Sequence, residues 1–276
     1  MTSDPREVLS RPARPADFTL RYGEHPDQLA DVRLAAVPDA PLVLFIHGGF
    51  WRSEWDRAHT APLAADLAER GYAVATVEFR RTGQPGGGWP GTFSDVASAA
   101  VAVPDLLAKE IAHRGLRPVA IDRPILAGHS AGGHLALWYA AVAPDAVGGV
   151  VALAPVADLA RAHELDLDDG AVADLLGGPP DQVPEAYTAA DPMRNLPSKV
   201  RTVVVHGSDD PIVPVELSRA FCRMARRAGD DTTLVELEGV EHFAVIDPLS
   251  AAWPAVLAAF GTVTLGESQA EADTDD

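Results

Sequence analysis

Ser130 is the residue around which the chemistry of this sequence is arranged. It lies in the stretch Gly128-His129-Ser130-Ala131-Gly132, which directly follows the apolar run "PILA". This spacing fits G-x-S-x-G, a pattern in which a strand turns sharply into a helix and presents a serine hydroxyl at the end of the sheet. The glycines two residues before and after the serine fit so tight a turn, since their neighbours must be small. We therefore predict that Ser130 is a nucleophile and that the amino end of the following helix stabilises a developing anion.

The candidate acid and base follow Ser130 in the chain. A serine is a weak nucleophile at neutral pH and needs a base, which a third group must orient. Asp209 and Asp210 come directly after the apolar run "RTVVVHG", where a carboxylate can point into the site, and His242 lies in a loop after the last apolar run. We expect His242 to be the base in preference to the other histidines beyond the serine, which are His134, His163 and His206.

A glycine pair supplies candidate donors for an oxyanion. The apolar run "PLVLFI" ends in His47-Gly48-Gly49-Phe50-Trp51. Two adjacent glycines let the backbone approach a ligand and turn its N–H groups toward it. We expect the N–H groups of Gly48, Gly49 and Ala131 to form the oxyanion hole, and His47 to have a structural role.

The elements that must position these residues alternate along the chain. Runs rich in Val, Ile, Leu and Phe predict eight strands, and stretches of helical periodicity lie between most of them. The first two runs alternate apolar and polar residues, as in antiparallel strands, whereas later runs are continuously apolar, as in strands covered on both faces. The pattern predicts an α/β fold with a mostly parallel eight-stranded sheet and helices on both faces. The strands are expected within 17–23, 31–37, 41–47, 72–79, 124–129, 148–155, 201–207 and 232–238, and the helices within 56–70, 93–114, 131–142, 215–228 and 249–260.

Residues 17–262 are expected to form one domain. Residues 1–16 are an N-terminal extension, and residues 263–276 form an acidic tail that we expect to be disordered. A segment at about 158–198 is too long for one crossover helix and contains Gly and Pro interruptions. It predicts a short lid-like insertion, with an additional packing element as the alternative.

Composition excludes several functions. The formal charge is −18, with 40 acidic against 22 basic residues, so binding to nucleic acid or to an anionic membrane surface is not expected. The single cysteine, Cys222, cannot form an intramolecular disulfide and is expected to be a buried thiol. Neither a signal peptide nor a run of 18 apolar residues is found, which predicts a cytoplasmic protein. We expect neither a metal nor a cofactor, and the oligomeric state stays open, a homodimer included.

Taken together, these motifs resemble the α/β-hydrolase superfamily over residues 17–262. "HGGFW" is similar to the oxyanion motif of kynurenine formamidases (arylformamidases), whereas the hormone-sensitive-lipase-like esterases carry HGGG, from which Phe50 departs. "HGSDDPIVP" resembles an HG-x-x-D-x-x-VP acid motif whose aspartate falls on Asp210, and "EHF" resembles the loop of the catalytic histidine at His242. The resemblance implies a Ser130–Asp210–His242 triad.

The function expected from these residues is hydrolysis of a small carboxylic ester or aryl formamide through an acyl-enzyme. Aromatic residues in or beside the motif loops predict a substrate pocket, to which we also assign the histidine before the serine. The alternatives are a non-catalytic ligand-binding protein of the same fold, or an acyltransferase or peptidase that uses the same triad. The predicted substrate-binding residues are Phe50, Trp51, Trp89, His129 and Phe243.

Overall fold

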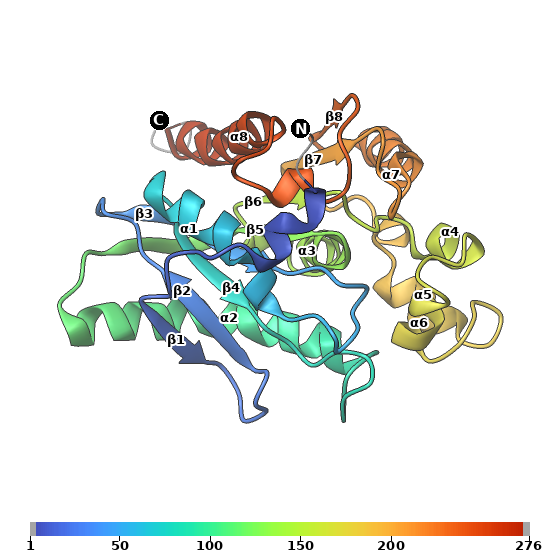
Figure 1. Cartoon of the computed structure of the whole chain (residues 1–276), viewed down its shortest axis with the longest axis horizontal. Coiled ribbons are helices and arrows are strands. Elements are labelled where there is room, and N and C mark those ends of the chain that lie inside the picture. The colour runs from blue at the N-terminus through green and yellow to red at the C-terminus, as the bar shows by residue number, and fades with distance from the viewer. Residues whose placement is uncertain (1–3, 273–276) are drawn as a thin grey trace.

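Eight strands form a single sheet at the centre of the molecule. The computed structural model describes residues 4–272, and Figure 1 shows the sheet flanked by helices. The strand order is β1-β2-β4-β3-β5-β6-β7-β8, and the pairs β1–β2 and β2–β4 are antiparallel whereas all others are parallel. The strands are β1 (Phe18–Arg21), β2 (Leu29–Arg33), β3 (Ala40–Ile46), β4 (Ala73–Val77), β5 (Val119–His129), β6 (Gly149–Leu153), β7 (Thr202–Gly207) and β8 (Thr232–Leu237). The expected α/β class, with a mostly parallel eight-stranded sheet, is confirmed.

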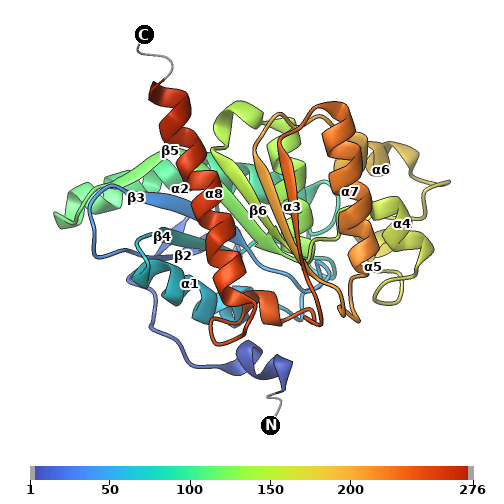
Figure 2. The ribbon, with the colours of Figure 1, turned by 90° about the horizontal axis from the view of Figure 1, so that it is seen from above.

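Helices cover both faces of the sheet because the strand residues alternate between two cores. In β3, Leu42, Leu44 and Ile46 join one buried cluster, and Val43 and Phe45 join the other. The first cluster packs against α2 and α3, and the second against α1 and α8, which lie together on the opposite face (Figure 2). The long helices are α1 (Ala61–Glu69), α2 (Gly91–Arg114), α3 (Ala131–Val142), α7 (Val215–Ala228) and α8 (Trp253–Ala272).

Two helix boundaries differ from the sequence expectation. The stretch at 56–70 divides into a short 3-10 helix, η2 (Arg57–Thr60), and α1, with Pro62 early in α1. The last helix continues to Ala272 and so includes residues 263–272 of the tail expected to be disordered. The acidic composition of the tail indicated disorder, but the Glu, Gln and Ala residues in this stretch are also good helix formers. Residues 273–276 of the tail lie outside the described residues, and the domain division stays a prediction.

The insertion folds as short helices, as the Gly and Pro interruptions indicate. It contains α4 (Leu159–Glu164), α5 (Ala171–Leu176), α6 (Pro184–Ala190) and the 3-10 helix η4 (Pro192–Arg194). Val172, Leu175 and Tyr187 are buried in the first core cluster. The segment is therefore a packed part of the fold.

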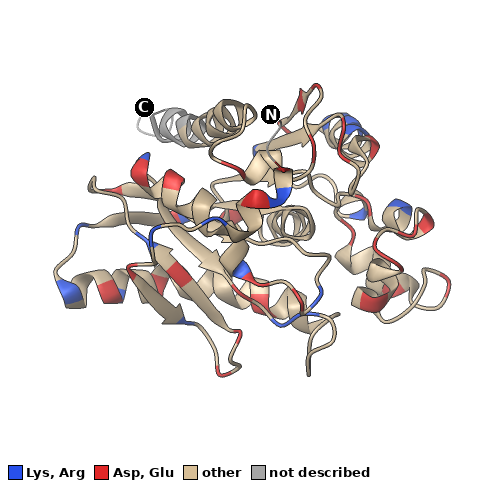
Figure 3. Ribbon diagram, viewed as in Figure 1, with Lys and Arg blue, Asp and Glu red and all other residues tan. Residues whose placement is uncertain are grey.

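A 3-10 helix, η1 (Pro5–Ser10), lies in the N-terminal extension. Two further short helices, η3 (Pro144–Ala146) and η5 (Ala244–Ile246), lie in loops. Lys and Arg residues are dispersed over several elements and are outnumbered by Asp and Glu (Figure 3). None of the helices within residues 4–272 combines the length and apolar character needed to cross a bilayer.

Candidate active site

Ser130 occupies a strained turn between β5 and α3. Its backbone has φ 55° and ψ −118°, a region that non-glycine residues rarely adopt. The turn is packed so closely that a Cβ on Gly128 would lie 2.3 Å from the Gly132 carbonyl oxygen, and one on Gly132 would lie 2.0 Å from that of Ile46. The small residues predicted on either side of the serine are therefore a steric requirement.

Asp210 and His242 form a buried, hydrogen-bonded pair. His242 Nδ1 lies 2.6 Å from Asp210 Oδ2, and the backbone N–H groups of Ile212 and Val213 donate to Oδ1 at 2.8 Å each. Burial alone would raise the pKa of Asp210, but hydrogen bonds from His206 and His242 hold it well below its usual value. The carboxylate is therefore ionised at neutral pH and can hold the imidazole in one orientation. Asp209, by contrast, accepts a hydrogen bond from its neighbour Ser208 at 2.8 Å.

His206 is a member of this arrangement that the sequence did not indicate. Its Nε2 lies 3.2 Å from Asp210 Oδ2 and 2.9 Å from the Val213 carbonyl oxygen, and its Nδ1 lies 2.7 Å from Ser218 Oγ. The ring is completely buried. His206 therefore helps to orient Asp210 although it does not line the pocket itself. Its place at the end of a buried strand directly before the acid loop was the available signal.

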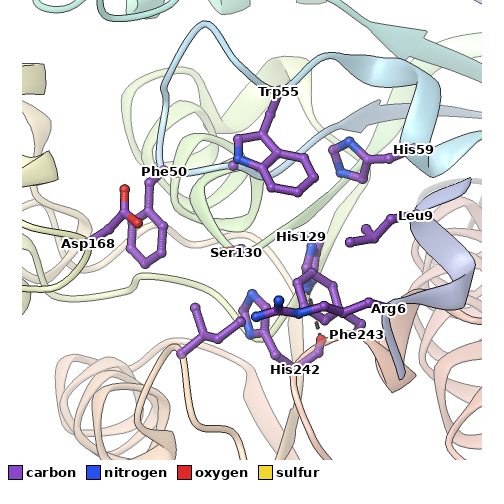
Figure 4. A pocket seen from close by; sticks show the side chains of 12 residues that line it. Arg6, Leu9, Phe50, Trp55, His59, His129, Ser130, Asp168, His242 and Phe243 are labelled. Carbon is purple, nitrogen blue, oxygen red and sulfur yellow. Dashed lines mark hydrogen bonds between the residues drawn. The ribbon is translucent and has the colours of Figure 1, made fainter. Parts of the chain in front are cut away.

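Ser130 and His242 line the same pocket, which has a volume of about 300 Å³. Figure 4 labels both residues among the side chains that line this space. No hydrogen bond joins Ser130 Oγ to His242 within residues 4–272, and such bonds are often long in ligand-free active sites and tighten only when substrate binds. The complete lining is Arg6, Leu9, Gly49, Phe50, Trp55, His59, His129, Ser130, Asp168, Ile212, His242 and Phe243.

The glycine loop after β3 provides unpaired backbone donors. The N–H groups of Gly48, Gly49 and Ala131 make no hydrogen bond with any of the described residues, and Gly49 lines the pocket. Gly49 has φ +107°, and a Cβ there would lie 2.3 Å from Trp55 Cβ, so only glycine fits. His47 anchors the loop because its Nε2 contacts Glu78 Oε1 and its Nδ1 contacts the Gly48 carbonyl oxygen, both at 2.8 Å. These donors can bind an oxyanion next to Ser130.

The predicted substrate-binding residues divide into two groups. Phe50, His129 and Phe243 line the pocket, whereas Trp51 and Trp89 do not. Phe50 and Trp51 both have positive φ, 46° and 58°, and this turn directs Trp51 into the core, where it is 1% exposed and packs edge-on against His134. Trp89 packs instead against Phe93, with ring centroids 4.8 Å apart. Neither Trp51 nor Trp89 therefore contributes to the wall of this pocket, and their assignment as substrate-binding residues stays a prediction.

His129 lines the pocket and also supports the loop that carries His242. Its Nε2 lies 3.1 Å from the His242 carbonyl oxygen. Because a carbonyl oxygen can only accept, this nitrogen carries the ring proton and donates a hydrogen bond to that oxygen. The two rings are 4.5 Å apart between centroids. Burial lowers the pKa of His129 well below its usual value, which keeps the ring neutral. His129 thus fixes the backbone of the loop that carries His242.

Several lining residues were not found from the sequence. Trp55 and His59 come from the loop and short helix after β3, Asp168 comes from the insertion, and Arg6 and Leu9 come from η1. None of them lies in a recognisable motif, and they are brought to the site by tertiary packing. Within the described residues, no group of three or more His, Cys, Asp or Glu side chains is arranged to hold a metal ion.

The sheet and the site define a class of protein, the α/β-hydrolase fold. Ser130, at the strand–helix turn, lines the same pocket as His242, which Asp210 holds by a hydrogen bond. Comparison with known proteins identifies the family. Residues 31–224 match the family model BD-FAE, and the chain belongs to this family.

Relatives and solved structures agree with the predicted resemblance. Esterase LipC of Mycobacterium tuberculosis is 27% identical over 80% of this chain, and kynurenine formamidase of Danio rerio is 25% identical over 83% of it. The aligned parts cover 58% and 75% of those two proteins, so the chain spans less than two thirds of LipC. Esterase B of Lactobacillus rhamnosis superposes with a TM-score of 0.74 at 20% identity, over 97% of this chain and 92% of that one. The resemblance to esterases and formamidases of this superfamily is confirmed.

Proposed function

We propose that this protein is a serine hydrolase that cleaves a small carboxylic ester or an aryl formamide through an acyl-enzyme intermediate. The observation that carries the proposal is the convergence, on one pocket, of a strained Ser130 and of a His242 that an ionised Asp210 holds at Nδ1. The esterase and formamidase relatives support the same reaction class.

Each of the proposed catalytic groups has a defined part in this reaction. Ser130 Oγ attacks the carbonyl carbon while His242 Nε2 takes its proton, and Asp210 stabilises the imidazolium that forms. The N–H groups of Gly48, Gly49 and Ala131 bind the oxyanion of the tetrahedral intermediate. His242 then protonates the leaving alcohol or amine, and a water molecule activated by the same histidine releases the acid product.

The dimensions and walls of the pocket favour a small substrate. A volume of about 300 Å³ lies at the lower end of the range for small-molecule sites. Phe50, Trp55 and Phe243 give the pocket aromatic walls, which suit an aryl leaving group or a short acyl chain.

Replacement of Ser130 tests the function directly. We expect Ser130→Ala to reduce turnover of 4-nitrophenyl butyrate to the background rate and to abolish labelling by a fluorophosphonate probe, because both reactions require the hydroxyl. Circular dichroism and thermal melting serve as the control that the variant remains folded. Turnover that is retained by Ser130→Ala would contradict the proposal. A wild-type protein that the probe does not label would also contradict it and would favour a ligand-binding protein.

A comparison of substrates distinguishes the two reaction types. The rates on N-formylkynurenine and on a series of 4-nitrophenyl esters are measured side by side, with Ser130→Ala as the blank. A kcat/KM that is larger for the formamide assigns the chain to formamide hydrolysis, and turnover of esters alone assigns it to carboxylesterases. Product analysis with added alcohols or amines separates hydrolysis from acyl transfer.

A further inference from the structure

The N-terminal segment is fastened next to the loop that carries His242. Asp4 caps η1 by accepting a hydrogen bond from the Arg6 N–H at 2.9 Å, and Val8 is 1% exposed within the second core cluster. The Arg11 guanidinium makes two contacts with the Asp247 carboxylate, and its Nη2 lies 3.0 Å from Oδ2. Asp247 directly follows η5, which itself begins two residues after His242. These contacts hold the segment beside the pocket.

Two side chains of η1 form part of the pocket wall. Arg6 and Leu9 both line it, and Figure 4 shows the Arg6 side chain extending from η1 into the space that His242 and Phe243 face. Arg6 is exposed and its guanidinium makes neither an ion pair nor a hydrogen bond with the residues that the structure describes. Its donors are therefore free to bind a substrate in the pocket.

Among the residues that the structure describes, Arg6 lines the pocket without forming an ion pair. The carboxylate of Asp168 is engaged by Arg52, whose Nε lies 2.6 Å from Oδ2 and whose Nη2 donates to the Asp168 carbonyl oxygen at 2.7 Å. Burial lowers the pKa of His59 to about 4 and that of His129 well below its usual value, so both rings are neutral at pH 7. The Arg6 guanidinium thus gives the pocket wall a positive charge, although the formal charge of the whole chain is −18.

We propose that Arg6 selects substrates that carry a carboxylate, so that the natural substrate is an anionic ester or amide. A guanidinium presents paired N–H donors that match the two oxygens of a carboxylate, and such charge-assisted pairs are stronger than neutral hydrogen bonds. The inference rests on the proposed hydrolase function. It assigns a substrate class to the same pocket and a role in specificity to the N-terminal segment.

Matched substrate pairs test the proposal. One pair places the charge on the acyl side: mono(4-nitrophenyl) glutarate and neutral 4-nitrophenyl pentanoate. The other places it on the leaving group: 4-carboxyphenyl butyrate and neutral 4-carbamoylphenyl butyrate. We expect Arg6→Gln to lower kcat/KM about tenfold for at least one carboxylate substrate, through KM, and to change the neutral partners by less than about twofold.

Three controls separate charge recognition from a structural effect. Arg6→Lys retains the charge and is expected to recover part of the lost activity, and added salt is expected to weaken only the reactions of carboxylate substrates. Arg14→Gln removes another arginine of the same segment, which pairs with Asp17 at 2.8 Å and lies outside the pocket, and is expected to behave like wild type. Equal loss on charged and neutral substrates, or no loss on either, would overturn the proposal.

The affinity of a variant without the nucleophile tests carboxylate recognition by Arg6 separately from the hydrolase function. The affinity of Ser130→Ala for mono(4-nitrophenyl) glutarate is measured by calorimetry, with and without Arg6→Gln. A weaker affinity in the double variant supports carboxylate recognition even if the wild type shows no turnover, in which case only the hydrolase function fails. Turnover of neutral esters together with equal affinities would leave the hydrolase function intact and reject the role of Arg6.

Discussion

At the scale of single residues, the candidate site depends on the charge state of Asp210. The Asp210 side chain is completely buried, and two backbone N–H groups and two imidazoles surround its carboxylate oxygens. These donors compensate for the cost of burial, and they explain why the pKa of Asp210 is lowered although burial alone would raise it. Asp209 is its neighbour in sequence, yet it makes its hydrogen bond with Ser208 and none with a histidine.

We expect Asp210→Asn to lower kcat for 4-nitrophenyl butyrate by about 10³- to 10⁴-fold, because an amide can hold His242 in the wrong tautomer and cannot stabilise the imidazolium. The matched control is Asp209→Asn, which should change kcat by less than about twofold, as expected for a substitution outside the site. Initial rates under saturating substrate provide the measurement. If the Asp209 variant lost as much activity as the Asp210 variant, the assignment of the acid would be wrong.

At the scale of elements, the turn from β5 to α3 determines whether the nucleophile can be presented. The Gly132 Cα lies so close to the end of β3 that an added Cβ would overlap the Ile46 carbonyl oxygen. This oxygen is backbone, so the clash cannot be relieved by a side-chain rotation. The close approach of α3 to the sheet therefore depends on glycine at this position.

We expect Gly132→Ala to lower the free energy of unfolding by about 3 kcal/mol or to prevent folding, because the methyl group forces apart two packed elements. Urea unfolding followed by circular dichroism measures the effect. Gly261→Ala, in α8, is the matched control: a Cβ there meets no atom within 4 Å, and the change should be neutral or stabilising by about 0.5–1 kcal/mol. Similar stabilities for the two variants would contradict the packing argument.

The sequence predicts the parts of the site that local geometry determines. The elbow at Ser130 and the glycine pair at Gly48 each have steric signatures that can be read within a few residues. Trp51 had no such signature. Its burial depends on two successive positive φ angles, at Phe50 and Trp51, and neither residue type predicts this conformation. Arg6 was also missed, since tertiary contacts such as the packing of Val8 and the pair between Arg11 and Asp247 bring this extension to the pocket.

At the scale of the whole molecule, one buried ionic group lies beneath the oxyanion loop. Glu78 is 1% exposed, and its Oε1 contacts His47 Nε2 at 2.8 Å and Arg81 Nη1 at 3.3 Å. Burial would raise its pKa, but the charges and hydrogen bonds of these neighbours lower it to about 2. The glycine loop that would supply the oxyanion donors is therefore connected to the end of β4 through His47 and Glu78.

We expect this carboxylate to make the stability depend on pH in the acid range. A folded-state pKa of about 2, against 4.5 for the free group, stabilises the fold fully above pH 4.5. This contribution, about 3 kcal/mol at most, is lost as the pH falls from 4.5 toward 2. The free energy of unfolding of wild type and Glu78→Gln is measured by urea titration between pH 7 and pH 2.5. The difference between the two should narrow as the pH falls, and a constant difference would contradict the linkage.

The way in which η1 is attached affects how molecules enter and leave the pocket. Its contacts with the rest of the protein centre on Val8 and on the pair between Arg11 and Asp247, whereas the groups that would carry out catalysis are set in the sheet and its packed helices. Local opening of such a segment requires far less free energy than global unfolding. We therefore expect the wall formed by Arg6 and Leu9 to open locally more readily than the elements that carry Ser130, Asp210 and His242. Product release can then set the turnover rate independently of bond cleavage.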